Sequence, residues 1–210
     1  MEPSVATIIF NFTHNSQFIT KLSINNKDVE VIDSTRLLGT IIQKNLKWDL
    51  NTAEIVRKAN ARMEILRRVS SFGAPIKDLR DIYVLFVRSL LEQSATVWHS
   101  SITQQNSDDL ERVQKNAFRI ILKNDYQNYS KALIKLDMEK LCDRREKLCL
   151  SFAKKCVNNP KTTHMFPRNL KSHDMQTRNP EKFLVQHALN DRLKDSPIIY
   201  MQNLLNIHKV

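Results

Sequence analysis

Hydrophobic and polar residues follow two different periods along the chain, and the change falls near residue 50. Before it, short apolar or alternating runs typical of strands lie at residues 7–12, 18–24, 29–32 and 36–42. The turn-forming residues 25–28 between two of these runs predict a β-hairpin. Strands this few and this short do not make an independent sheet, so residues 1–43 are expected to be an antiparallel edge of a larger one.

From Asn51 the apolar residues recur with the 3.6-residue period of a helix, which predicts two helices up to residue 98. Asn51 and Glu54 form a capping-box pattern, and Gly73 and Pro75 mark the joint between the two helices. The second helix, residues 75–98, carries apolar residues on nearly every side. Such a helix normally lies at the centre of a bundle, so we expect it to be the most buried element.

Three more helices are expected: one over residues 107–123 capped by Ser107, a short one capped by Ser130, and one over residues 138–158. Helices of this length joined by short loops predict a helical bundle over residues 44–160. Residues 161–210 are expected to form a basic, mostly irregular tail with short helices near 181–193 and 197–206. The predicted fold class is mainly α, a helical bundle preceded by a small antiparallel β-hairpin, and α+β overall.

Charge is distributed unevenly over these regions. The net charge is +11, the isoelectric point is about 9.7, and the first 50 residues are neutral, with five basic and five acidic groups. Residues 51–160 hold 20 basic and 13 acidic groups, so the helical part carries much of the excess. A basic domain of this kind favours a polyanionic partner, nucleic acid before membrane, although a basic surface can also serve solubility alone.

Two basic stripes account for the charge that we assign to binding. Opposite the apolar face of helix 107–123 the sequence places Arg112, Lys115, Arg119 and Lys123. Beside the apolar face of helix 138–158 it places Lys140, Arg144, Lys147 and Lys154. Stripes of one sign suit a phosphate backbone, whose contacts contribute affinity without sequence specificity. The alternative for each stripe is a solvated helix face.

The sequence predicts no catalytic residues, no metal site and no cofactor. Asp108 and Asp109 form the only adjacent acidic pair, and they lie at a predicted helix start, where the helix dipole explains carboxylates. Cys142, Cys149 and Cys156 recur every seven residues, which places three small apolar side chains on one helix face. A zinc site would need more closely spaced pairs.

The expected cellular location of the protein follows from two further observations. The N-terminus shows no signal-peptide pattern, and the longest apolar run, residues 82–87, is far shorter than the ~20 residues that span a bilayer. We therefore expect an intracellular protein, nuclear or cytoplasmic, that does not bind membranes.

Two arginines are expected in the core. Arg62 and Arg145 each project from the middle of a predicted apolar helix face. A buried guanidinium without partners is too costly to persist, so each should meet a carboxylate or several carbonyls, with Glu92 the candidate for Arg62.

Several short motifs in order resemble the segment after the polymerase core of non-long-terminal-repeat retrotransposon reverse transcriptases, the LINE and jockey-like families. They are Arg36-Leu37-Leu38-Gly39-Thr40, Leu46-Lys47-Trp48, Lys58-Ala59-Asn60-Ala61-Arg62, Ile82-Tyr83 with Val87-Arg88-Ser89, Leu91-Glu92, Val97-Trp98, and Leu110-Glu111-Arg112-Val113-Gln114-Lys115. Segments in the tail, residues 177–182 and 200–205, are similar to the ends of some members. The resemblance covers nearly the whole chain.

The resemblance implies a palm edge over residues 1–43 and a thumb over residues 44–160 that grips template–primer duplex, an RNA–DNA hybrid among others. Leu37, Leu38 and Gly39 would form the primer-grip-like turn. The Y-x-D-D aspartates and the lysine of the N-x-x-K-(S/T) stretch have no counterpart here, so we expect a truncated element product without polymerase activity. Mg²⁺ would belong to the missing palm, and the palm of a full-length enzyme is a possible partner.

Two other interpretations remain open at this point. The chain could be a helical protein–protein interaction module that docks a partner or itself, or an element fragment without function.

Overall fold

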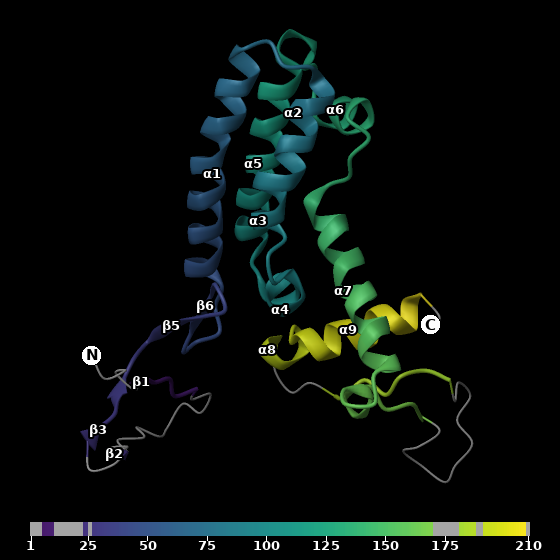
Figure 1. The fold of residues 1–210 in the computed structure, drawn as a ribbon. Coiled ribbons are helices and arrows are strands. Elements are labelled where there is room, and N and C mark those ends of the chain that lie inside the picture. The colour runs from purple at the N-terminus through teal and green to yellow at the C-terminus, as the bar shows by residue number, and fades with distance from the viewer. Residues whose placement is uncertain (1–5, 11–22, 25–26, 170–180, 188–190, 209–210) are drawn as a thin grey trace.

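The computed structural model describes residues 6–10, 23–24, 27–169, 181–187 and 191–208. It confirms the predicted fold class: the described residues are mainly helical, with a few small strand pairs before the helices. In Figure 1 the long helices stand side by side, the strands lie beyond the lower end of α1, and α9 crosses the lower part of α7.

The strands form three separate two-stranded pairs. They are β1 (Ala6–Thr7) with β4 (Glu30–Val31), β2 (Ser23–Ile24) with β3 (Lys27–Asp28), and β5 (Ser34–Leu37) with β6 (Thr40–Gln43). The β2–β3 pair is an antiparallel hairpin at the predicted place, but its second strand, Lys27–Asp28, lies inside the predicted turn, so the predicted pairing of 18–24 with 29–32 is wrong. Residues 30–31 pair with β1 instead, and this pair is parallel, so the expectation of antiparallel strands throughout is also wrong. Of the strand predicted at 7–12, residues 7–10 are described, and only Thr7 belongs to a strand, so most of this prediction is wrong. The strand predicted at 18–24 falls largely outside the described residues.

The single strand predicted at 36–42 is a hairpin instead. Leu38 and Gly39 form its two-residue loop with φ angles of 48° and 88°, and both values are positive, as in a type I′ turn. A Cβ atom on Gly39 would come within 2.6 Å of the Gln93 Nε2 atom and would displace that flexible side chain, and the φ of 88° itself favours glycine at this position.

Helix α1 (Asp49–Ser71) begins two residues before the predicted start. Asn51 is buried inside the helix and its Oδ1 atom accepts a hydrogen bond of 3.0 Å from the Ile41 amide, which ties α1 to β6. Glu54 pairs with Arg36 and Arg57, so the predicted capping box is wrong.

The helix predicted at 75–98 is interrupted twice. It consists of α2 (Ile76–Ile82), π-helical turns at Tyr83–Arg88, α3 (Ser89–Leu91) and α4 (Ala95–Trp98), with a φ of 53° at Ser94 before α4. Its buried positions recur every four residues: Leu79, Tyr83, Val87, Leu91 and Ala95. A four-residue repeat is longer than the 3.6-residue α-helical period, and π-turns, with more residues per turn, fit it better.

Burial also differs from the prediction for this segment. Leu85 and Phe86 are 67% and 48% exposed, so the segment buries one face only. The prediction that it is the most buried element is therefore wrong. Helix α5 (Gln104–Leu122) buries more of its length, at Asn106, Leu110, Glu111, Val113, Gln114, Ala117, Phe118, Ile121 and Leu122.

The remaining helices complete the bundle. Thr103, not Ser107, caps α5 by accepting a hydrogen bond from the Asn106 amide, and Asn128, not Ser130, caps α6 (Tyr129–Lys135). The side chains of buried residues from α1, α2–α4, α5 and α6 and the start of α7 (Leu141–Asn158) form the main core.

A second, smaller core involves the C-terminal part of α7. Ala153 and Cys156 of α7 pack with Phe166, Phe183, Met201 and Leu205. Helix α9 (Pro197–Ile207) confirms the predicted helix at 197–206. Within the described part of the predicted helix at 181–193, however, Phe183 forms a bridge with Arg168, and only residues from Asp191 on, in α8 (Asp191–Lys194), are helical. The described part of the tail is thus packed against α7 and not an irregular appendage.

Candidate nucleic-acid interface

We call Arg112, Lys115, Arg119 and Lys123 the α5 stripe, and Lys140, Arg144, Lys147 and Lys154 the α7 stripe. The α5 stripe lies on the outer face of α5, where Lys115 is half-buried and the other three side chains are exposed. Lys115 places its Nζ atom 5.2 Å from the centre of the Tyr129 ring, and Arg119 lies 5.5 Å from the centre of the Tyr126 ring. Neither cation forms an ion pair within the described part of the chain. These contacts orient both cations while their charge stays available to solvent.

The two ends of this stripe have partners in the protein. Arg112 forms an ion pair with Asp109, one turn before it, and its side chain remains 61% exposed. Lys123 donates a 2.7 Å hydrogen bond from Nζ to the Ser70 carbonyl at the end of α1. Lys123 therefore stabilises the carbonyl end of α1, a role that the sequence pattern did not indicate.

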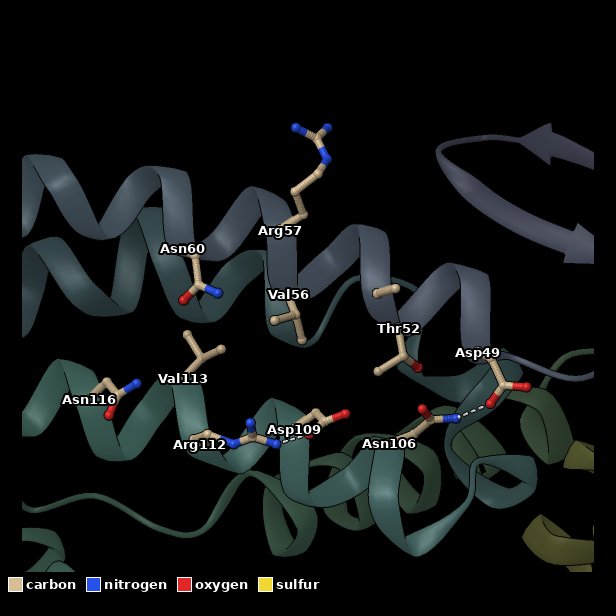
Figure 2. A pocket seen from close by; sticks show the side chains of 11 residues that line it. Asp49, Thr52, Val56, Arg57, Asn60, Asn106, Asp109, Arg112, Val113 and Asn116 are labelled. Carbon is tan, nitrogen blue, oxygen red and sulfur yellow. Dashed lines mark hydrogen bonds and ion pairs between the residues drawn. The ribbon is translucent and has the colours of Figure 1, made fainter.

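Arg112 also borders a groove between α1 and α5 (Figure 2). The groove has a volume of about 390 Å³, and Val56 and Val113 face each other across it. Two carboxylates line it: Asp109 pairs with Arg112, and Asp49 accepts a 2.8 Å hydrogen bond from the neutral Asn106 amide and keeps its negative charge. The groove is therefore a weaker candidate for an anion than the outer face of α5.

The α7 stripe differs because two of its members are held by carboxylates from other parts of the chain. Arg144 donates from Nε and Nη2 to both carboxylate oxygens of Glu92, the Nη2 bond being 3.1 Å, and Lys147 lies 2.6 Å from Glu139. The hydrogen bond to Glu92 raises the pKa of Arg144, and the one from Lys147 lowers the pKa of Glu139. Lys140 and Lys154 are exposed.

The two stripes border different neighbours. The α5 stripe adjoins α1 through Lys123 and α6 through Lys115, whereas the α7 stripe adjoins the end of α3 through Arg144. The structure therefore does not bring all eight predicted residues together around one point.

Two arginines next to the α7 stripe were missed by the sequence analysis. Arg88, in the π-helical turns, lies 3.7 Å from Glu92, and Arg80 in α2 donates a 3.2 Å hydrogen bond to the Asp137 carbonyl. Burial, followed by the nearby Arg144 charge, lowers the pKa of Arg88, and Arg80 contributes in the same direction. The sequence does place Arg80 and Arg88 in the same apolar segment. The hydrophobic period of that segment, however, does not indicate which neighbouring helix the two arginines face.

Of the two arginines predicted to lie in the core, Arg145 is buried and Arg62 is exposed. Arg145 is fully buried, as expected, but its partners are neutral: His99 Nδ1 at 3.3 Å, Ser107 Oγ at 3.0 Å and the Trp98 ring at 5.8 Å. The expectation of a carboxylate or carbonyl partner is wrong. Burial and then the Arg145 charge lower the pKa of His99 to about 4, so His99 is neutral near pH 7.

Arg62 is exposed, and its guanidinium donates a 2.7 Å hydrogen bond to the Phe86 carbonyl. Met63 occupies the buried position instead. The predictions of a buried Arg62 and of Glu92 as its partner are both wrong, because Glu92 is engaged by Arg144.

A buried hydrogen-bond network connects α5 to its neighbours beneath the α5 stripe. Tyr83 donates to Gln114, Gln114 donates to the Tyr129 hydroxyl and the Glu139 carbonyl, and Tyr129 donates to Glu111. Glu111 also accepts from the Leu141 amide at the start of α7. This network fixes the Tyr129 ring on which Lys115 rests, and burial raises the pKa of Tyr129.

The other predicted site residues are exposed or paired. Leu37 and Leu38 at the primer-grip-like turn are 58% and 91% exposed. Asp108 and Asp109 lie in the second turn of α5, not at its start, and accept hydrogen bonds of 2.9 Å from Gln104 and Gln105. Cys149 and Cys156 are buried as expected, whereas Cys142 is exposed.

No helix within the described ranges is long and apolar enough to cross a membrane. The chain matches no family model, and neither curated proteins nor solved structures give a match. Any inference about function therefore depends on the chain's own residues and on the resemblance of its motifs.

Proposed function

We propose that the protein binds nucleic-acid duplex, an RNA–DNA hybrid among others, without sequence preference, through the outer face of α5. The observation that carries this proposal is the pair Lys115 and Arg119, which extend from α5 over tyrosine rings. With Arg112 they form a basic surface that continues for about 16 Å along the helix to Lys123. A straight row of cations on a rigid helix suits a phosphate backbone better than a single small ligand.

The resemblance to reverse-transcriptase thumbs agrees with this activity. On this proposal the bundle is a thumb-like module that holds duplex, and the palm of a full-length polymerase is a candidate partner. The sequence contains no Y-x-D-D motif, so we propose that this chain does not polymerise nucleotides and requires no Mg²⁺ of its own for binding.

The direct test is duplex binding by fluorescence anisotropy with three hybrids of unrelated sequence. We expect similar affinities for all three, and about tenfold or greater weakening when Arg112, Lys115 and Arg119 are changed to Gln together. Lys123 stays unchanged because it supports α1. The matched control changes Arg67, Arg68 and Lys155 to Gln, which removes the same charge elsewhere. Equal weakening by both triple variants would reject the α5 face, and primer extension by the purified protein would reject the non-catalytic assignment.

A second candidate function, protein–protein interaction, is favoured by one observation. Ile65 of α1 and Leu85 and Phe86 of the π-helical turns are large apolar residues that are 48%, 67% and 48% exposed. Arg62 bonds the Phe86 carbonyl, so these parts of the two helices adjoin. Sedimentation of the wild type and of Leu85→Ser separates the candidates: a self-associating protein should become monomeric, and a monomeric wild type would reject self-association.

A further inference from the structure

Two arginines from distant segments, Arg88 and Arg144, meet where the π-helical turns pass α7. Both contact Glu92, Arg88 at 3.7 Å and Arg144 through two hydrogen bonds. A third, Arg80, lies eight residues before Arg88 in the same helical segment, and its charge, after burial and the Arg144 charge, also lowers the pKa of Arg88. We call Arg80, Arg88 and Arg144 the arginine cluster.

The charges of the cluster are only partly compensated within the described part of the chain. Arg88 and Arg144 share one half-buried carboxylate, Glu92, whose side chain is 14% exposed. Arg80 has a separate partner, the Asp137 carboxylate at 3.6 Å, which is fully exposed and therefore screened by water. The neighbouring Lys147 and Glu139 neutralise each other. One positive charge thus remains without a counter-charge, and the charge of Arg80 is offset only by an exposed carboxylate.

Hydrogen-bond donors remain free as well. The Arg88 side chain is only 17% exposed, yet its sole polar contact in the described ranges is the 3.7 Å approach to Glu92, which is too long for a hydrogen bond. Its nitrogen atoms are not among the sealed polar atoms without partners, so they reach solvent from a recessed position. The Arg80 Nε atom is buried and has no partner.

The π-helical turns help to explain why Arg80 and Arg88 act together. In an unbroken α-helix, residues eight apart lie about 80° apart around the axis. The wider turns at Tyr83–Arg88 rotate the chain less per residue and so bring Arg88 closer to the line of Arg80. Like charges held close together in a half-buried place are unfavourable unless an anion joins them.

We propose that the arginine cluster is a binding site for a phosphate group that carries two negative charges. A terminal phosphate has three oxygens that can accept from the free donors of more than one planar guanidinium fork. An internal phosphodiester has only two such oxygens and carries less charge, so it is the weaker match. The ligand is either free phosphate or the phosphorylated end of a nucleic-acid strand. This site is separate from the α5 face and stands whether or not that face binds duplex.

The first experiment is calorimetric titration of the whole protein with inorganic phosphate near pH 8, with sodium chloride adjusted to hold ionic strength constant. We expect phosphate to bind at one site. Arg88→Gln should abolish this binding, and Arg88→Lys should weaken the affinity about tenfold, because lysine keeps the positive charge but lacks the planar guanidinium group with its paired donors. Arg67→Gln is the matched control, since Arg67 is an exposed arginine paired with Glu64 on α1. Circular dichroism checks that each variant is folded.

The second experiment assigns the source of the phosphate. A short duplex with a 5′-phosphate is compared with the same duplex ending in a 5′-hydroxyl, using wild type and Arg88→Gln. Tighter binding of the phosphorylated duplex that Arg88→Gln removes assigns the site to a strand end, and equal binding assigns it to free phosphate. No phosphate binding in the calorimeter, or binding that Arg88→Gln leaves unchanged, would overturn the proposal.

Discussion

The outer face of α5 and the seam between α3 and α7 use the same kind of residue in opposite ways. On α5, Lys115 and Arg119 rest on tyrosine rings and keep their charge toward water. At the seam, Arg88 and Arg144 converge on Glu92, with side chains 17% and 30% exposed. Exposed cations are free to exchange counterions for phosphates, whereas half-buried cations contribute to folding and to a defined local site.

A basic stripe in a sequence therefore does not define a binding surface by itself. Both stripes have the spacing of a solvated helix face. What separates them is a carboxylate 52 residues away in the chain, Glu92, which α3 brings to Arg144.

Removing the carboxylate at the seam should have the largest effect. Glu92→Gln leaves Arg88 and Arg144 half-buried without a counter-charge, and we expect a loss of about 2–3 kcal/mol in the free energy of unfolding. Urea denaturation measures it. The double variant Glu92→Gln with Arg144→Gln should recover part of the lost free energy of unfolding, since it removes one of the two half-buried positive charges left without a partner. An unchanged denaturation midpoint in Glu92→Gln would show that the stability of the seam does not depend on this carboxylate.

The buried side of α7 should make stability depend on pH. The pKa of His99 is about 4 in the folded protein because burial and Arg145 disfavour its charged form, against 6.5 for an ordinary histidine. The stabilising contribution of neutral His99 is therefore complete above about pH 6.5 and is lost as pH falls toward 4. Between pH 7 and pH 5 the loss should be about 1–2 kcal/mol.

Thermal or urea denaturation at both pH values provides this measurement. In His99→Gln the side-chain oxygen can still accept from Arg145 but does not titrate, so the pH dependence should shrink by the same amount. An identical pH dependence in the variant and the wild type would contradict the assignment.

The matched change on α5 should have almost no effect on stability. Asp109→Asn removes the partner of Arg112, whose side chain is 61% exposed, and we expect a change within about 0.5 kcal/mol. A loss as large as that of Glu92→Gln would show that the α5 face is a structural network like the seam.

Local periodicity was enough to predict much of the fold. The 3.6-residue repeat located α1, α5, α7 and α9 because each buries one face of an unbroken helix. It failed at residues 75–98, where a four-residue repeat of buried positions is accommodated by π-turns and where Ser94 breaks the helix. It also failed at Leu38, since a turn with two positive φ angles can contain a leucine that gives no turn signal.

The candidate site was predicted less completely, because partners come from distant segments. The stripes on α5 and α7 could be read from spacing, but the cluster of Arg80, Arg88 and Arg144 depends on how two helices cross. Arg62 and Met63 are a related case: an error of one position on the helical wheel exchanged the exposed residue for the buried one. The neutral partners of Arg145 likewise could not be inferred without the fold.

On the function proposed above, the salt-dependent binding of duplex comes from the charges of the exposed α5 face and not from the lysines of the α7 stripe. The most direct measurement is the slope of log affinity against log salt for wild type, for the α5 triple variant at Arg112, Lys115 and Arg119, and for an α7 triple variant at Lys140, Lys147 and Lys154, all changed to Gln. With a slope of roughly −0.9 per phosphate contact, the α5 variant should be less steep by about 2–3, while the α7 variant should stay near the wild type. Equal flattening in both variants, flattening by the α7 variant alone, or binding that ignores salt would contradict the account.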